Sequence, residues 1–448
     1  MRKFLVLLIL LGPVLGQDDE TEIEIDEPPT GEAEKPKPKP SSAQPAKPGK
    51  EAKAEPELPL QERINAAIER GVSWLKQSQL KDGSYGPCVA GRRYGSNVRD
   101  PRECYNVGPT AFAVFTLRKC GVPRKDPVIK KAVKWLKKTC RTGWSPDLRR
   151  VEGTQIQGKG IYYYTTYESS ALIMMLVALN KKDLRKGVKP KPVKLSRSPT
   201  IPTSGFKKDE WEWMHERVQF LINNPHSRMH PAQVKGGGWR YYPQNREADS
   251  DLSATQFALL GLRDAVSAGY PVHLLEPKAW LWAADGARRF QQADGGFSYR
   301  RDTPWTAGMT AAGIACLFIC KEQITNLGQT PPDWLQEQAK AGLEFLGQHL
   351  DFTRNQYAPT SKEGRPDGIG YHFYHLYGIE RVGALSGKHE IGGKAWYPRG
   401  AKWLVDVQMP NGSWLDPTCM PPKDVLGTCF ALLFLKKATP PTVTVTSR

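Results

Sequence analysis

The sequence has 448 residues, a formal net charge of +18 and eight cysteines. Such a basic surface favours an anionic partner, for example lipid headgroups or acidic polysaccharide, although a solvated face that keeps a protein soluble is the more common reason for it. No CxxC pair occurs, which argues against a zinc ribbon or a thioredoxin-like redox site. No motif indicates recognition of a specific nucleic acid.

The first residues have the order of an export signal. Arg2 and Lys3 precede an apolar run from Phe4 to Leu11, and small residues follow near Gly16. The run is too short for a permanent membrane span, which needs about 20 apolar residues, and no second stretch approaches that length. We therefore expect residues 1–16 to be a signal peptide, and the protein to be secreted or periplasmic without a transmembrane segment.

Residues 17–60 change from an acidic stretch, DDETEIEIDEPP, to a proline-lysine stretch, KPKPKPSSAQPAKPGK. Neither stretch can bury enough apolar surface to offset the entropy that ordering costs. We expect a disordered spacer here, a folded domain over 61–438 and a flexible tail over 439–448.

An amphipathic helix followed by a turn of glycine and an aromatic residue recurs along the folded part, as in the segments 64–87, 129–146 and 398–416. The turn glycines Gly83, Gly143, Gly238, Gly296 and Gly412 are 60, 95, 58 and 116 residues apart. The last spacing is two periods of 58, so another repeat lies between, and the segment 333–352 supplies its helix. The spacing of 95 is one period plus a basic insert, which we place at 181–208.

A second helix, richer in small and apolar residues, follows each turn, as in PTAFAVFTLRKCG, YESSALIMMLVALN and LSATQFALLGLRDA. A helix that is apolar all round is buried all round, whereas the first helix of each pair has the polar stripe of a surface helix. Six such pairs predict an all-α fold, in which an outer and an inner ring of helices form an α/α toroid.

The glutamine, glycine and aromatic turns QQADGGFSY and VQMPNGSWLD resemble the repeats of the prenyltransferase and squalene cyclase superfamily. The resemblance covers about Gln61 to Ala438 and implies the α/α toroid of that superfamily. Its members include terpene cyclases, protein prenyltransferase β subunits and exported bacterial proteins of unknown role, and the chain looks most like the last group.

Terpene cyclases of class II protonate an alkene with an aspartate of an Asp-Xaa-Asp-Asp-Thr-Ala motif. The stretch DSDLSA matches this motif at Asp249 and Asp251, but Leu252 stands in place of the last aspartate. The resemblance makes Asp251 a candidate acid with Asp249 beside it. The competing interpretation is that Asp251 caps the helix that follows, because its carboxylate would accept hydrogen bonds from the free N–H groups there.

Prenyltransferase β subunits bind catalytic zinc partly through the histidine of a Phe-Tyr-His sequence, which occurs here at 373–375. The other half of that site fails, since Pro304 follows Asp302 where a thiolate is required. His226 and His230 have metal-like spacing but lack an acidic third ligand. We expect no metal and no cofactor.

A third possibility is glycan hydrolysis by two carboxylates. Glu168 and Asp251 would both lie near the start of an inner helix, and hence near one end of the ring.

The opening where the inner helices begin, here called the mouth, would be lined by aromatic and polar residues. Aromatic side chains can hold an apolar chain, a glycan or a peptide segment. We therefore expect a binding protein rather than an enzyme, although the same residues could simply pack between helices. The candidate ligand-binding residues are Tyr164, Tyr167, Trp239, Trp305, Thr306, His372, Tyr374 and His375.

Overall fold

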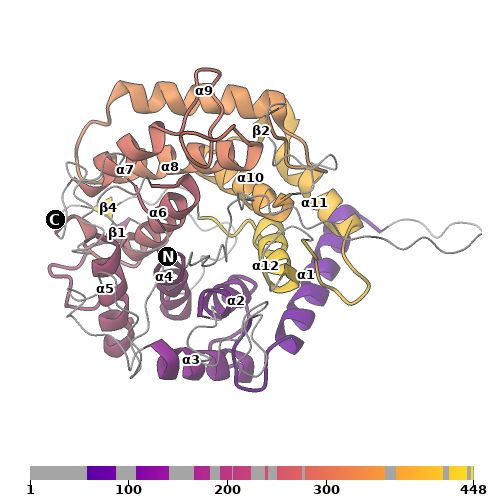
Figure 1. Ribbon diagram of the computed structural model, residues 1–448. Helices are drawn as coiled ribbons and strands as arrows, with labels where there is room; N and C mark the ends of the chain where they lie inside the picture. The colour runs from indigo at the N-terminus through magenta and orange to yellow at the C-terminus, as the bar shows by residue number, and fades with distance from the viewer. Residues whose placement is uncertain are drawn as a thin grey trace, which may run out of the picture.

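The computed structural model describes residues 58–86, 107–140, 166–181, 192–203, 205–222, 238–240, 250–274, 278–358, 370–416, 423–440 and 445–446. Within them, twelve α-helices alternate between an outer and an inner position around a ring (Figure 1). The outer helices are α1 (Leu60–Gln77), α3 (Pro127–Cys140), α5 (Lys208–Ile222), α7 (Ala279–Arg288), α9 (Asp333–His349) and α11 (Trp396–Asp406). The inner helices are α2 (Val107–Lys119), α4 (Thr166–Asn180), α6 (Leu252–Ser267), α8 (Ala307–Asn326), α10 (His372–Ser386) and α12 (Lys423–Lys436).

Each inner helix contacts the next, and α12 returns to α2, so the inner ring is closed. The two kinds of helix differ in burial as their sequences predict. In α3 only Ile129, Ala132, Leu136 and Cys140 are buried, at the spacing of one helix face. In α4 fourteen consecutive residues from Thr166 to Leu179 are buried. The arrangement agrees with the predicted ring of paired outer and inner helices.

A glutamine at the end of several outer helices fastens neighbouring repeats together. Gln79 Nε2 donates to the carbonyl oxygens of Gly83 and Val128, at 3.0 and 2.9 Å, and so joins the first turn to α3. Gln291 makes the same pair of hydrogen bonds to Gly295 and Gln338 on α9. These glutamine clasps explain why glutamine recurs at one position of the repeat.

The last glutamine clasp closes the ring. Gln408 Nε2 donates to the carbonyl oxygens of Ala67 and Gly412, both at 2.9 Å, so the turn after α11 is fastened to α1. Gly412 has a φ of 90°, which favours glycine, and a Cβ there would lie 2.7 Å from the Arg70 carbonyl oxygen. In the fourth repeat the positive φ belongs to Gly295 and not to Gly296, the residue that the spacing suggests.

In four of the described turns, a threonine of the following inner helix accepts a hydrogen bond from the turn. The backbone N–H of the turn aromatic donates to a threonine Oγ1 in Tyr85–Thr110, Trp239–Thr255, Phe297–Thr310 and Trp414–Thr428, at 2.8 to 3.0 Å. The side-chain acceptor satisfies a buried N–H group that has no partner in the turn itself.

Four short strands lie outside the helices in the described part of the chain. Strands β2 (Glu390–Ile391) and β3 (Lys394–Ala395) form an antiparallel hairpin before α11. Strand β1 (Val193–Lys194) belongs to the basic insert and pairs in parallel with β4 (Val445–Thr446) of the C-terminal tail. The insert and the tail, expected to be a loop and a flexible end, therefore meet in a small sheet.

The residues that follow α12 (Lys423–Lys436) lie at the end of the ring opposite the mouth. Thr439 donates through its N–H and its hydroxyl to the two carboxylate oxygens of Glu380, at 2.9 and 2.6 Å. Arg263 donates to the Pro440 carbonyl oxygen at 3.1 Å. Residues 439–440 thus connect α12 to α10 and α6.

One helix in the described part of the chain, α8, is long and apolar enough to cross a membrane, and 89% of it is buried inside the fold, as in the core helix of a soluble protein. Cys316, Cys320 and Cys429 are buried free thiols.

Candidate functional site

Asp251 begins the third inner helix and caps it. Its Oδ1 accepts a hydrogen bond from the Ala254 N–H at 2.7 Å, and its carbonyl oxygen accepts from the Thr255 hydroxyl at 2.7 Å. The backbone φ of −122° is extended, as expected at an N-cap. The capping interpretation of Asp251 is therefore confirmed.

Two turns of the ring meet at Asp251. The Asp251 N–H donates to the Trp239 carbonyl oxygen at 3.0 Å, and the Leu252 N–H donates to the Tyr299 carbonyl oxygen at 3.0 Å. Arg240 and Arg300 follow these two aromatic residues directly in the sequence. The turns of two different repeats thus bring two guanidinium groups close to one carboxyl group, and we call Asp251, Arg240 and Arg300 the Asp251 site.

The second oxygen of Asp251 is not used by the cap. Asp251 is completely buried, and its Oδ2 has no hydrogen-bond partner among the described residues. The nearest cationic atom there is Arg240 Nη1, 3.9 Å away, which is also buried without a described hydrogen-bond partner. This distance is too long for a direct hydrogen bond.

Burial raises the pKa of Asp251 to about 6, because removal from water disfavours the charged carboxylate. The hydrogen bond from Ala254 and the charges of Arg240 and Arg300 oppose this rise. At neutral pH Asp251 is therefore mostly ionised, with a protonated fraction much larger than that of an exposed aspartate.

Glu168 and Tyr167 lie in the first turn of α4, the inner helix next to α6, and both are buried. The Tyr167 ring packs edge-on against Phe257 with ring centroids 5.2 Å apart. A Cβ at Gly108 would lie 3.4 Å from Glu168, so this glutamate faces the start of α2.

The tryptophans predicted to line the mouth pack between helices. Trp239 is 5% exposed, and its indole N–H donates to the Leu221 carbonyl oxygen. Trp305 is 7% exposed and packs against Phe345 and His349.

Thr306 is the N-cap of α8, and its hydroxyl accepts from the Met309 N–H at 3.0 Å. Like Asp251, it is placed at the mouth by its capping position.

The residues of the predicted His-Phe-Tyr-His stretch are buried at the start of α10. His372 Nε2 lies 2.9 Å from the Phe352 carbonyl oxygen, and burial lowers the pKa of His372 to about 4 and that of His375 to about 3. Both rings are therefore neutral at pH 7. The Tyr374 hydroxyl donates to Gln256 Oε1 at 2.6 Å, which ties α10 to α6.

No group of three or more potential metal ligands occurs among the described residues. Asp302, the other half of the zinc motif considered above, is exposed and lies 3.4 Å from Arg300 Nε.

Tyr164, Asp249, His226 and His230 lie outside the described residues. The sequence motifs predict neither Arg240 nor Arg300 as a site residue. Their signal in the sequence is a shared position, since each follows the aromatic residues of a glycine turn, in GGGWR and GGFSYR.

No protein-family model and no curated protein matches the sequence. Among solved structures, the type II terpene cyclase MstE from Scytonema, without a ligand, is similar with a TM-score of 0.45 and 11% identity, over 85% of this chain and 99% of that chain. A possible member of the GH105 family from Salmonella enterica serovar Paratyphi A is similar with a TM-score of 0.48 and 12% identity, over 88% and 98%. At such values the likeness concerns the arrangement of helices and not the role of any residue.

Proposed function

We propose that the protein binds a hydroxyl-rich ligand of the glycan class at the mouth, with Asp251 and Arg240 as its polar anchors. The observation that supports this proposal is the 3.9 Å gap between Asp251 Oδ2 and Arg240 Nη1, two buried polar atoms without hydrogen-bond partners among the described residues. Leaving such groups unsatisfied costs about 1–3 kcal/mol each. A hydroxyl group between them donates to the carboxylate and accepts from the guanidinium, so it satisfies both atoms.

A hydroxyl fits this gap better than other groups do. A purely apolar ligand would leave both atoms unsatisfied, and a carboxylate ligand would be repelled by Asp251. Arg300 adds a second cation near Asp251, and its Nε also forms an ion pair with Asp302 Oδ1 at 3.4 Å. The site therefore offers one acceptor and several donors, a combination suited to a ring of hydroxyl groups.

The test is isothermal titration of the full chain with soluble cello- and chito-oligosaccharides. Asp251→Asn keeps a side-chain oxygen for the cap but replaces a charged acceptor by an amide, and we expect at least a roughly tenfold loss of affinity. Asp285→Asn is the matched control, because Asp285 pairs with Arg288 and Arg289 on the outer helix α7. Equal affinity of wild type and Asp251→Asn would refute the proposal.

A second candidate is general acid catalysis of glycan cleavage, which the raised pKa of Asp251 favours. An acid with a pKa of about 6 suits protonation of a glycosidic oxygen near neutral pH, whereas protonation of an alkene requires a much stronger acid. Glu168, on the neighbouring inner helix, is the candidate partner carboxylate. If the wild type releases reducing ends and Asp251→Asn and Glu168→Gln do not, this candidate is supported. If the wild type binds the oligosaccharide without cleaving it, only the first proposal stands.

A further inference from the structure

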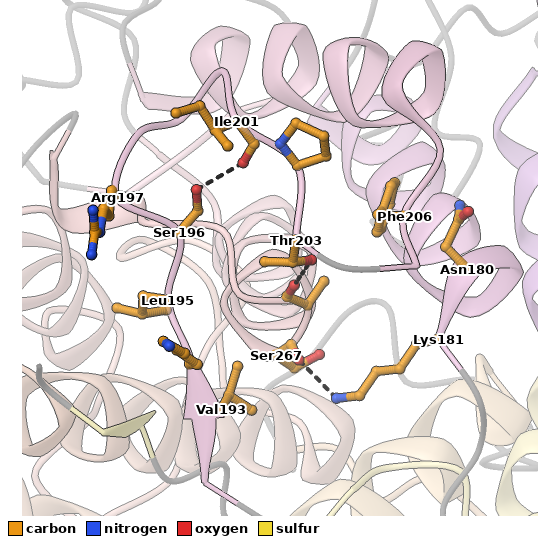
Figure 2. Close-up of a pocket in the computed structure, with 13 residues that line it drawn as sticks. Asn180, Lys181, Val193, Leu195, Ser196, Arg197, Ile201, Thr203, Phe206 and Ser267 are labelled. Atoms are coloured by element: carbon orange, nitrogen blue, oxygen red, sulfur yellow. Dashed lines mark hydrogen bonds between the residues drawn. The ribbon is translucent and has the colours of Figure 1, made fainter.

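A cavity of about 510 Å³ lies where α4 and α6 end, and so at the end of the ring opposite the mouth. Figure 2 shows the residues that line it. We call it the insert pocket, because the basic insert forms one of its sides and the ends of α4 and α6 form the other. Its volume is within the range of small-molecule sites. Its lining residues are Asn180, Lys181, Val193, Lys194, Leu195, Ser196, Arg197, Ile201, Pro202, Thr203, Phe206, Ser267 and Ala268.

The interior of the insert pocket is mainly apolar. Carbon surface comes from Val193, Leu195 and Phe206, and two hydroxyl groups of the lining are engaged by the protein itself. Ser196 Oγ donates to the Ile201 carbonyl oxygen at 2.7 Å, and Thr203 Oγ1 donates to the Ala268 carbonyl oxygen at 2.9 Å. A ligand body inside the pocket therefore meets few free polar groups.

The charges of the lining have a single sign. Lys181, Lys194 and Arg197 are exposed, and none of the thirteen lining residues is acidic. Lys181 is held in place by the hydrogen bond from its Nζ to the Ser267 carbonyl oxygen at 2.8 Å, which Figure 2 shows. An apolar interior with three cations in its lining is complementary to a molecule with an apolar body and an anionic head.

The insert is fastened to the ring, although closing the ring does not require it. The Ser196 N–H donates to the Gly269 carbonyl oxygen at 2.7 Å, and the Trp211 indole N–H donates to the Pro199 carbonyl oxygen at 2.8 Å. Strand β4 pairs with β1 and so adds the C-terminal tail to the support of this side. The insert is therefore held to the rest of the protein at three places, and it encloses a cavity. A binding site needs such support from fixed surrounding structure.

We infer that the insert pocket binds a small anionic amphiphile, a molecule with an alkyl or other apolar body and one carboxylate or phosphate head. The body occupies the space between Leu195, Phe206 and Ala268, and the head lies by Lys194 and Arg197. This site is separate from the Asp251 site, since it lies at the C-terminal ends of α4 and α6 rather than at their beginnings.

The test uses the full chain and isothermal titration with three probes. Decanoate has both a tail and a negative head, decyltrimethylammonium has the tail with a positive head, and acetate has the negative head alone. We expect decanoate to bind and the other two to bind at least about tenfold more weakly. Equal binding of decanoate and decyltrimethylammonium, or of decanoate and acetate, would overturn the inference.

Two variants locate the site on the protein. Ile201 lines the pocket and is 55% exposed, so Ile201→Glu should leave the thermal unfolding temperature unchanged and abolish decanoate binding. Its matched control is Leu274→Glu, at a residue that is 50% exposed and does not line the pocket. The double variant Lys194→Gln/Arg197→Gln should lower the affinity about tenfold, and Lys388→Gln should not change it.

Two other results would contradict the inference. Unchanged decanoate affinity in Ile201→Glu would show that decanoate binds elsewhere. Co-sedimentation with phosphatidylglycerol vesicles, lost in Ile201→Glu, without any binding of decanoate would assign this surface to a membrane instead of a small molecule.

Discussion

Arg263 on α6 and Glu322 on α8 form a buried ion pair with two hydrogen bonds, of 2.9 and 3.0 Å, and their side chains are only 2% and 5% exposed. Gln323 also donates to Glu322, and Arg263 reaches the Pro440 carbonyl oxygen. The pair therefore joins two adjacent inner helices and the C-terminal tail in one polar network.

Loss of one partner of this pair should be costly. Glu322→Leu leaves the Arg263 charge buried without its carboxylate, and we expect the free energy of unfolding to fall by about 3–5 kcal/mol. The double variant Arg263→Met/Glu322→Leu, which leaves no charge at this pair of positions, should lose clearly less. Urea unfolding followed by circular dichroism measures both, and a double variant that is less stable than Glu322→Leu would contradict this account.

Asp251 should make the stability fall with rising pH between about pH 4 and 6. Its pKa in the folded state is about 6, above its unfolded value near 4, so the folded state binds more protons in this window and loses stability as they dissociate. Asp251→Asn removes this contribution. The stability of the variant relative to wild type should therefore increase by about 2 kcal/mol from pH 4 to pH 7. Urea unfolding at several pH values checks it, and a difference that stays constant would be evidence against the raised pKa.

Thr439 should matter more when Glu380 is charged. Burial raises the pKa of Glu380 to about 7, and the two hydrogen bonds from Thr439 oppose this rise by favouring the carboxylate. Thr439→Val removes the hydroxyl donor, so we expect a loss of about 1–3 kcal/mol at pH 8 and a smaller loss at pH 5, where Glu380 is protonated. Thermal unfolding at the two pH values compares them. Equal losses would mean that the ionisation of Glu380 is not linked to Thr439.

The glutamine clasp of Gln408 should contribute to the closure of the ring. Gln408→Leu removes two hydrogen bonds to backbone carbonyl oxygens of Ala67 and Gly412, and we expect about 1–3 kcal/mol of destabilisation. Exposed Gln348 on α9, replaced by leucine, is a suitable comparison. Hydrogen exchange should increase first in α1 and α11. Increases spread evenly over all the described helices would argue against a local role.

The sequence was sufficient for the helices and for one residue of the site. A helix that is apolar on one face is an outer helix, and a helix that is apolar on all sides is an inner helix. The sequence pattern therefore predicts the burial of each helix. Asp251 could be recognised as a cap from its place before an apolar helix. The approach of Arg240 and Arg300 could not be recognised, since it depends on two turns of different repeats meeting after the ring has formed.

Other features also depended on tertiary structure. Val193 and Val445 are paired across 252 positions of the chain. The stretch TVTVT around Val445 alternates in the way that a strand does, but the sequence alone does not show which distant segment pairs with it. The aromatic residues at the mouth predict a ligand surface, but aromatic composition alone does not show whether the rings face a cavity or one another. Trp305 packs against Phe345 and His349, and Tyr167 against Phe257.

Closure of the ring also determines when the protein can complete its folding during synthesis. Gln408 fastens to Ala67 across 341 positions, and α12 is the neighbour of both α1 and α2. In an open array of repeats each new repeat would cover the previous one, but here the apolar flank of α2 stays uncovered until the last helix has been made. The growing chain therefore exposes a core surface for almost the whole time of its synthesis, and we expect it to need a chaperone to avoid aggregation during that time.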